Sequence, residues 1–411
     1  MQPDGKGTSE SAARQGASVE FRHVTKRFGA GAADGKGTPG AVNDLSLIVP
    51  PGEICVLVGP SGCGKTTSLK MVNRLVEPTE GQVLIDGQDI STVRATVLRR
   101  RIGYVIQQIG LFPHQTIGEN VATVPRLLGW PKERIRSRVD ELLTLIGLDP
   151  GGVRDRYPSQ LSGGERQRVG VARAMAAEPP VMLMDEPFGA VDPIVRGRLQ
   201  NEFLRLHQEL GTTVLLVTHD IDEAIKMGDR VAIMQQGGYL AQYAPPAELL
   251  ANPANDFVAR FVGSDRGLKR LALMTVAEVD LREAATARVG EPVRSALARA
   301  AEAAYILLLD MDGRPEGWVN ARRLRPEGTL DSEAADPSSP IFTPATTLRD
   351  ALSMLLASAV QTGVVVDESG RYVGALTLEV VGAALRGATT PPPEALTIGS
   401  PSEPDDGHAA R

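Results

Sequence analysis

The sequence of 411 residues has only two cysteines, Cys55 and Cys63, and only 4% of its residues are aromatic. Two cysteines are too few for a disulfide framework. Long apolar runs are missing too: AAYILLL at 303–309 is among the longest, well short of the roughly 18 residues that cross a bilayer. The first 16 residues contain no apolar core of the kind that a secretory signal needs. We therefore expect the protein to stay in the cytosol.

The sequence has no excess of positive charge, because 44 Lys and Arg residues stand against 50 Asp and Glu residues and give a formal net charge of -6. Nucleic-acid-binding domains usually carry a basic surface, so we expect no nucleic-acid partner. The remaining composition, 42% hydrophobic and 23% charged, is that of a soluble globular protein. The length is sufficient for two or three domains.

Three segments are rich in glycine, serine, alanine and proline, a composition that rarely forms a packed core. We expect residues 1–18 and 389–411 to be disordered, and GAGAADGKGTPG at 29–40 to be a flexible loop. Between these segments the sequence predicts a long α/β region and a shorter second region.

Short continuous apolar runs recur in the long region, namely ICVLV at 54–58, VMLM at 181–184 and VLLV at 214–217. Each run is followed by a glycine-rich or polar turn and then by a helical pattern. Runs of this kind are typical of buried strands in a mostly parallel sheet with helices on its faces. Residues 115–178 show helical patterns with little strand signal, which predicts a helical insert.

The second region contains an internal repeat. YILLLDMDGRPEGWV at 305–319 and TGVVVDESGRYVGAL at 362–376 each predict a strand followed by a turn, and a helical segment with an Ala-Leu pair precedes each copy. Three residues match at one fixed offset: Asp310, Gly313 and Gly317 correspond to Asp367, Gly370 and Gly374. The sequence thus predicts two copies of one hairpin-plus-helix unit.

GPSGCGKT at 59–66 fits the phosphate-binding pattern G-x-x-x-x-G-K-[ST] and lies between a predicted strand and a predicted helix. In that context the glycines let backbone amides surround the phosphates, Lys65 reaches the β- and γ-phosphates, and the Thr66 hydroxyl binds Mg²⁺. A glycine turn in an ordinary strand-helix unit is the alternative interpretation. The predicted ATP-binding residues of this loop are Gly59, Pro60, Ser61, Gly62, Cys63, Gly64, Lys65, Thr66 and Thr67.

Two further strands are predicted to end in residues that suit ATP hydrolysis. VMLMDE at 181–186 ends in two acids, of which Asp185 is placed to hold Mg²⁺ and Glu186 to polarise the attacking water. VTHD at 217–220 brings His219 to another strand end, within reach of a γ-phosphate. Taken alone, either segment is also compatible with a strand that runs into a solvated turn or a helix cap.

LSGGERQRV at 161–169 contains an S-x-x-E capping box, in which Ser162 and Glu165 satisfy orphan amides at a helix start. The two residues between them are Gly163 and Gly164. Glycine costs up to about 1 kcal/mol relative to alanine inside a helix, so capping alone does not explain the pair. Paired glycines expose the backbone amides and the positive end of the helix dipole, which together favour an anion.

In order and approximate spacing, these motifs resemble those of ABC ATPase subunits. The set comprises GPSGCGKT, a glutamine in VIQQIGLFPH at 105–114, LSGGERQRV, MDEP at 184–187, VDP at 191–193 and THD at 218–220. The resemblance spans residues 19–262 and implies an α/β P-loop fold with a helical subdomain at about 107–178. It also implies that two such chains dimerise head to tail, with the LSGG helix of one closing on the ATP of the other.

This resemblance implies further roles, residue by residue. Ser162, Gly163, Gly164, Glu165 and Gln167 would contact the nucleotide held by a second chain. Gln107 would touch Mg²⁺ and the attacking water while signalling to a membrane permease. Phe28 would lie under the adenine, and Asp192 would lie at the dimer interface. The implied catalytic residues are Glu186, His219 and Gln107, and the implied Mg²⁺ ligands are Thr66, Gln107 and Asp185.

Within that family, QQIGLFPHQTIGENVATVPRLLGW at 107–130 resembles the ATPases of quaternary-amine importers, which take up glycine betaine, choline, carnitine or proline betaine. The repeat resembles a tandem pair of cystathionine β-synthase (CBS) modules at 268–328 and 340–388, an appendage typical of that group. The implied partners are a second copy, a permease and an extracytoplasmic substrate-binding protein, with the chain at the cytoplasmic face of the membrane. The alternatives are an importer for another small molecule such as an amino acid, a non-transport ABC ATPase and a stand-alone nucleotide sensor.

CBS modules that bind adenosine nucleotides resemble one another in a Thr or Ser followed three residues later by an Asp that binds the ribose. The second copy here has Thr377 but Val380, and the first has Asn320 and Arg323. We therefore predict that the pair does not bind AMP or ATP usefully. It would act as a dimerising clamp or hold another ligand between the copies, such as a cyclic dinucleotide near Arg322 and Arg323.

Overall fold

The chain divides into two compact units, Met1–Gly263 and Ser264–Arg411. The computed structural model describes residues 16–28, 40–106, 110–189, 192–300, 303–336, 339–358 and 361–386. Most of the predicted disordered or flexible segments, residues 1–15, 29–39 and 389–411, lie outside these ranges.

The prediction of disorder is wrong for residues 16–18. The amide of Gly16 donates to Gly211 O at 2.9 Å and that of Ala17 to Pro180 O at 3.1 Å. Ala17 is also buried in the main core. The composition of the segment did not indicate these hydrogen bonds, whose acceptors lie just before two strands of the central sheet.

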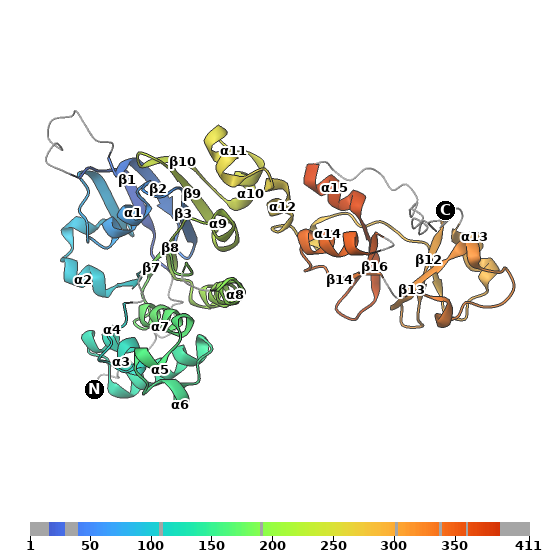
Figure 1. Ribbon diagram of the computed structural model, residues 1–411, viewed down its shortest axis with the longest axis horizontal. Helices are drawn as coiled ribbons and strands as arrows, with labels where there is room; N and C mark the ends of the chain where they lie inside the picture. The colour runs from blue at the N-terminus through green and yellow to red at the C-terminus, as the bar shows by residue number, and fades with distance from the viewer. Residues whose placement is uncertain are drawn as a thin grey trace, which may run out of the picture. The chain divides into compact units, whose positions relative to one another are not determined.

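A six-stranded, mostly parallel sheet forms the centre of the first unit, in the order β10-β9-β3-β8-β7-β6 (Figure 1). The three apolar runs of the sequence are confirmed as its central, fully buried strands, β3 (Ile54–Val58), β7 (Val181–Asp185) and β8 (Thr213–Thr218). All neighbouring pairs except the antiparallel β10–β9 pair are parallel. The other strands are β6 (Ile102–Val105), β9 (Arg230–Gln235) and β10 (Tyr239–Ala244).

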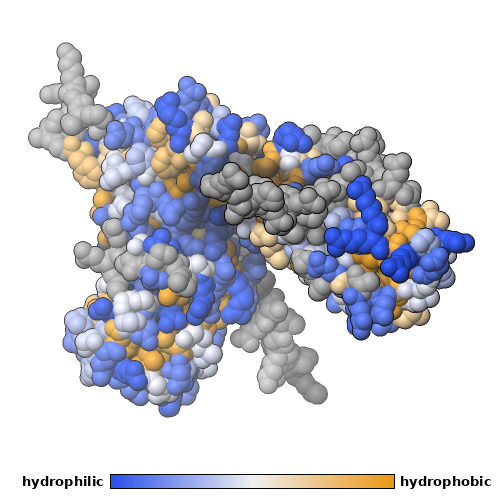
Figure 2. Space-filling view, turned by 45° about the vertical axis from the view of Figure 1, so that its right-hand side comes forward, coloured by the Kyte–Doolittle hydropathy of each residue, from blue (hydrophilic) through white to orange (hydrophobic). Residues whose placement is uncertain are grey.

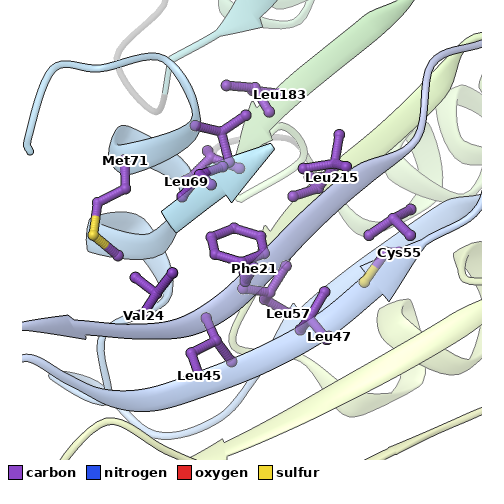
Figure 3. Close-up of a cluster of buried hydrophobic side chains, with 14 of the residues drawn as sticks. Phe21, Val24, Leu45, Leu47, Cys55, Leu57, Leu69, Met71, Leu183 and Leu215 are labelled. Carbon is purple, nitrogen blue, oxygen red and sulfur yellow. The ribbon is translucent and has the colours of Figure 1, made fainter. Parts of the chain in front are cut away.

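An antiparallel sheet in the order β2-β1-β4-β5 packs on this central sheet. Its strands are β1 (Val19–Lys26), β2 (Val42–Val49), β4 (Glu80–Ile85) and β5 (Gln88–Asp89). One core cluster joins the two sheets and the helix after β3: Phe21 lies among Leu57, Leu69 and Leu215 (Figure 3). Because these side chains come from both sheets and a helix, the core fixes where the loops at the strand ends lie.

Each of the central strands is followed by a helix that begins at a predicted motif. α1 (Lys65–Val72) follows β3, α8 (Pro193–Leu210) follows β7 and α9 (Ile221–Met227) follows β8. In a parallel sheet these turns gather at the carboxyl edge, where α/β proteins bind ligands. The remaining helices of the sheet region are α2 (Ala95–Arg100), α10 (Pro246–Ala251) and α11 (Asp256–Val262), with short 3₁₀ turns η1 (Ile90–Thr92) and η2 (Pro158–Gln160) in the unit.

The predicted helical insert is confirmed and projects from the sheet as a separate group of helices (Figure 1). It contains α3 (Ile117–Val121), α4 (Thr123–Leu127), α5 (Lys132–Leu145), α6 (Pro150–Val153) and α7 (Gly163–Met175). Its core includes Ile117, Val139, Leu142 and Leu143. Helix α7 also lies against β6, so it connects the helical group to the sheet.

The internal repeat of the second unit is confirmed down to its turns. Each copy is a three-stranded sheet, β11-β12-β13 or β14-β15-β16. The Asp310 carboxylate accepts from the amides of residues 312 and 314, and the Asp367 carboxylate accepts equivalently from residues 369 and 371. The strands are β11 (Thr286–Arg288), β12 (Tyr305–Leu309), β13 (Pro315–Asn320), β14 (Ile341–Phe342), β15 (Thr362–Val366) and β16 (Tyr372–Thr377), with helices α13 (Val293–Ala300), α14 (Leu348–Ala357) and α15 (Leu378–Arg386).

The sequence predicted the two copies as consecutive blocks, 268–328 and 340–388. The structure does not divide them in this way. Helix α12 (Arg266–Leu271) and the 3₁₀ turn η3 (Val276–Glu278) pack into the core of the second copy. Leu271 and Val276 lie there in one cluster with Phe342, and the amide of Leu348 donates to Met274 O at 2.9 Å. The first copy has only a 3₁₀ turn, η4 (Ala321–Arg323), where the second has helix α15.

Candidate active site

The phosphate-binding loop between β3 and α1 needs glycine at two positions for steric reasons. Gly59 has φ of +154° and Gly64 has φ of +95°. A Cβ at residue 59 would lie 2.1 Å from Met234 O, and one at residue 64 would lie 2.1 Å from Ala41 O. The loop is therefore held against the neighbouring backbone at both ends.

Lys65 lies inside this loop and is only 7% exposed. Its Nζ donates to Gly59 O at 2.7 Å and to Pro60 O at 3.0 Å. Gly64, which precedes α1, has no side chain that could cap the first-turn amides of the helix. An ammonium group beside uncapped helix amides fits a polyphosphate, whose oxygens can replace the two carbonyl acceptors.

Thr66 and Asp185 meet across the gap between α1 and β7. The Thr66 Oγ1 donates to Asp185 Oδ1 at 3.0 Å, and Asp185 is 4% exposed. Burial raises the pKa of Asp185 above its ordinary range, the Thr66 hydrogen bond opposes the shift, and the charge of Glu186 adds to it. A hydroxyl and a buried carboxylate are hard oxygen donors, so this pair fits Mg²⁺.

Glu186 follows Asp185 in a strained backbone conformation, with φ of +47°. Such a conformation is uncommon outside glycine, asparagine and aspartate and is often found at functional sites. The Glu186 amide donates to Val217 O at 2.9 Å, which fixes the residue against β8. At the end of β8, His219 Nδ1 lies 3.3 Å from Glu186 Oε1. A carboxylate and an imidazole are therefore paired at the edge of the sheet that carries the loop.

The predicted capping box is present at the start of α7. The Ser162 amide donates to Glu165 Oε2 at 2.7 Å, and the Glu165 amide donates to Ser162 Oγ at 3.3 Å. Hydrogen bonds from Ser162 lower the pKa of Glu165. A Cβ at Gly163 or Gly164 would meet no heavy atom within 4 Å in the described part of the chain. The chain itself therefore imposes no steric need for either glycine.

Gln167, predicted to contact the nucleotide of a second chain, has a buried side chain in its own chain. Its side chain is 5% exposed, and its Nε2 donates to Pro187 O at 2.6 Å. The amide thus ties helix α7 to the turn after Glu186 within one chain. No sequence pattern signals this contact, because it depends on how α7 is rotated against the sheet.

Of the other predicted site residues, two are exposed and one falls outside the described ranges. Phe28 is 59% exposed and has the Lys26 ammonium 5.1 Å from its ring centre. Asp192 is exposed, and its carbonyl accepts from the amide of Arg196 at 2.8 Å at the start of α8. Gln107 lies outside the described residues.

The described residues contain no group of three or more His, Cys, Asp or Glu side chains arranged to hold a metal ion. No helix in the described ranges is long and apolar enough to span a membrane.

Comparison with known proteins gives two family matches: ABC transporter over residues 42–189 and CBS domain over residues 333–381. The osmoprotectant import ATP-binding protein OsmV of Salmonella typhimurium is 47% identical, over 88% of this chain and 95% of that protein. The glycine betaine/carnitine/choline transport ATP-binding protein OpuCA of Bacillus subtilis is 43% identical, over 83% and 91%.

Solved structures of isolated cassettes are similar to the first unit. A dimeric ATP-binding cassette bound to ADP and phosphate in a post-hydrolysis state has a TM-score of 0.50 and 34% identity, over 56% of this chain and 98% of that one. The cassette cbiO1 of Clostridium perfringens has a TM-score of 0.52 and 27% identity, over 58% and 92%.

Proposed function

This chain belongs to the family of ABC transporter ATP-binding proteins, and from that membership we propose that it powers the import of a quaternary-amine osmolyte of the glycine betaine, choline or carnitine type. The observation that carries the proposal is the convergence of Lys65, the Thr66–Asp185 pair and the Glu186–His219 pair at one sheet edge. The names of the relatives supply the class of solute. They favour this class over amino acids and over a function outside transport.

Each of these residues has a separate role in the hydrolysis of ATP. Lys65 and the loop amides bind the phosphates and hold the γ-phosphoryl group in place. Glu186 accepts a proton from the water that attacks the γ-phosphorus, and His219 orients both that carboxylate and the phosphate oxygens. The bond to the β-phosphate breaks, and ADP and phosphate result. Thr66, Asp185 and Gln107 would hold Mg²⁺, which would neutralise charge on the phosphates.

A second copy of the chain is proposed to complete each site. The glycines at 163 and 164 leave open space over the first-turn amides of α7, and their own chain does not require it. A γ-phosphate held by another chain fits that space because exposed helix amides favour an anion. Ser162 and Glu165 then keep the helix start in order, while Gln167 connects α7 to the turn beside the catalytic Glu186.

The permease is proposed to dock on the helical group. A groove of about 730 Å³ there is lined by Arg126, Trp130 and Lys132, among other residues. Leu127 and Leu128 beside it are 56% and 42% exposed, and the surface of this group mixes hydrophobic with hydrophilic residues (Figure 2). Exposed leucines near a groove are suited to receive a protein segment. The chain would then lie peripherally at the cytoplasmic face of the membrane.

One experiment tests hydrolysis and transport together. The chain would be co-expressed with its permease and binding protein in cells that lack osmolyte uptake, and the uptake of labelled glycine betaine, choline and carnitine would be measured. We expect uptake of at least one of them, lost in a Lys65→Ala variant. Uptake of an amino acid in place of all three would overturn the solute assignment, and uptake unaffected by Lys65→Ala would overturn the role of ATP.

A further inference from the structure

A buried polar pair joins two helices behind the site. Glu223 in the first turn of α9 is 8% exposed, and Gln200 in α8 is 6% exposed. Gln200 Nε2 donates to Glu223 Oε1 at 3.0 Å. Polar side chains are costly to bury unless they are hydrogen-bonded, so neither would be expected here without the other. None of the nucleotide-binding motifs contains either residue.

Glu223 holds the backbone on both sides of His219. Burial raises the pKa of Glu223, and side-chain hydrogen bonds from Thr218 and Gln200 oppose the shift. The Thr218 Oγ1 also accepts from the amide of Asp220 at 3.1 Å. The Asp220 carboxylate in turn accepts from the amide of Glu223 at 3.3 Å. The residues before and after His219 are thus both tied to Glu223, Thr218 through its carboxyl group and Asp220 through its backbone amide.

Through Gln200, the same carboxyl group is connected to the segment that follows Asp192. Helix α8 begins at Pro193, and Gln200 lies two turns along it. A second hydrogen bond joins the same two helices: Lys226 Nζ of α9 donates to Gly197 O of α8 at 3.3 Å. Displacement of the start of α8 would therefore be transmitted to α9 and to the residues around His219.

We propose that Glu223 is a positioning residue that holds His219 beside Glu186 and couples it to the helix after Asp192. This inference rests on the proposed function and on the head-to-tail dimer, in which the family resemblance places Asp192 at the interface with a second chain. When that chain closes on Asp192, α8 carries the displacement through Gln200 to Glu223. The contact between His219 and Glu186, which is already present in one chain, is thereby coupled to closure of the dimer. Charged groups that face Glu223 are Asp220 and Lys226 on its own helix and Arg196 on α8.

An exchange of the two side chains tests the proposal. In Glu223→Gln, one of the two acceptor oxygens becomes a donor with almost no change in volume, so the side chain can no longer accept from both Thr218 and Gln200. We expect kcat to fall about 10- to 100-fold, the effect of losing a hydrogen bond to a charged group, with the KM for ATP unchanged. The Hill coefficient for ATP should fall towards 1. The double variant Gln200→Glu with Glu223→Gln again pairs one donor with one acceptor between the two helices. Most of the wild-type kcat and Hill coefficient should therefore be recovered.

Two controls separate positioning from a general loss of stability. Glu209→Gln removes an exposed carboxylate from the same helix α8 and should leave kcat and the Hill coefficient at wild-type values. In a His219→Ala background, adding Glu223→Gln should cause no further loss, because the positioned group is already absent. A further loss there, or wild-type kinetics in Glu223→Gln, would overturn the inference. A wild-type protein without ATPase activity would instead overturn the proposed function.

Discussion

His219 Nδ1 lies 3.3 Å from Glu186 Oε1, across two strands that are direct neighbours in the sheet. The pairing of Asp185 with Val217 in these strands sets the two residues opposite each other just beyond the strand ends. The strained backbone of Glu186 turns its side chain at that point. Sheet register and the positive φ of Glu186 therefore bring Glu186 and His219 together, and both residues directly follow buried apolar runs of the sequence.

Glu186→Gln should abolish turnover while sparing ATP binding. The amide keeps the shape of the carboxylate but removes the negative acceptor for the proton of water. We expect the hydrolysis rate to fall at least about 100-fold, the lower range for loss of a general base. Equilibrium binding of ATP should stay near the wild-type value, and light scattering should show an ATP-dependent dimer. Turnover at the wild-type rate would contradict the role of Glu186.

Gly163→Ala should separate stability from activity. The added methyl group meets nothing within 4 Å in its own chain, and alanine is the better helix former. The melting temperature should therefore stay the same or rise. ATPase activity should fall, because the methyl group enters the space proposed for the γ-phosphate of the second chain.

The matched control for that change is Gly151→Ala in α6. A Cβ there makes only an ordinary contact, 3.6 Å from the Asp149 carboxylate. It should leave ATPase activity unchanged. If both alanine variants retain full activity, the glycines of α7 have no role at a second chain.

Mixed dimers test whether the two motifs act across the interface. Lys65→Ala should disable a chain's own phosphate loop, and Gly163→Asp should place a carboxylate against the partner's phosphate. A dimer of one variant with the other keeps one site with both defects and one with neither. Some activity should return on mixing two inactive proteins, measured as ATPase rate against mixing ratio. A large loss of ATP affinity in Gly163→Asp alone would argue for contact within one chain.

The sequence predicted the central strands well because each is a continuous apolar run bounded by a motif. β3 was predicted at its observed bounds, and β7 and β8 were predicted to within one residue at an end. The repeat was also predictable, since the Asp310 and Asp367 turns use the same local hydrogen bonds. Local patterns were therefore sufficient wherever the structure depends on near neighbours.

Two features could not be predicted because they depend on distant contacts. The inward position of Gln167 requires the position of Pro187 O, which no helical pattern of α7 specifies. Likewise, the packing of Leu271 beside Phe342 joins segments far apart in the chain. A helix as short as α12, with Leu271 as its one buried residue, fits either repeat by its pattern, and only tertiary packing selects one.

The second repeat should not bind AMP. Val380 stands where nucleotide-binding CBS modules have an acid, and it is 2% exposed within the repeat core. Thr377 accepts from the amide of Val380 at 3.4 Å, at the start of α15. We expect calorimetry of the full chain to give no heat of AMP binding at micromolar concentration. AMP binding that persists in a Lys65→Ala variant would contradict the prediction, because it would lie outside the phosphate loop.

Asp185→Asn should stabilise the nucleotide-free protein in a pH-dependent way. Burial, together with the charge of Glu186, raises the pKa of Asp185 in the folded state, against the opposing effects of Thr66, Lys70 and Lys65. A raised folded pKa means that the contribution to stability is fully present below the pKa of the unfolded chain. It is lost as the pH rises through the folded pKa. At pH 7 the ionised carboxylate is therefore unfavourable, and asparagine removes it while keeping an acceptor for Thr66 Oγ1.

The measurement is the melting temperature of both proteins between pH 4 and pH 8 without nucleotide. We expect the variant to melt a few degrees higher at pH 7, with the difference shrinking as the pH is lowered. Mg²⁺ with ATP should raise the melting temperature of the wild type, because a ligand that binds only the folded state stabilises it, and should raise that of the variant much less. A variant that melts lower at pH 7 would show that Asp185 contributes more through its bond to Thr66 than burial of its charge costs.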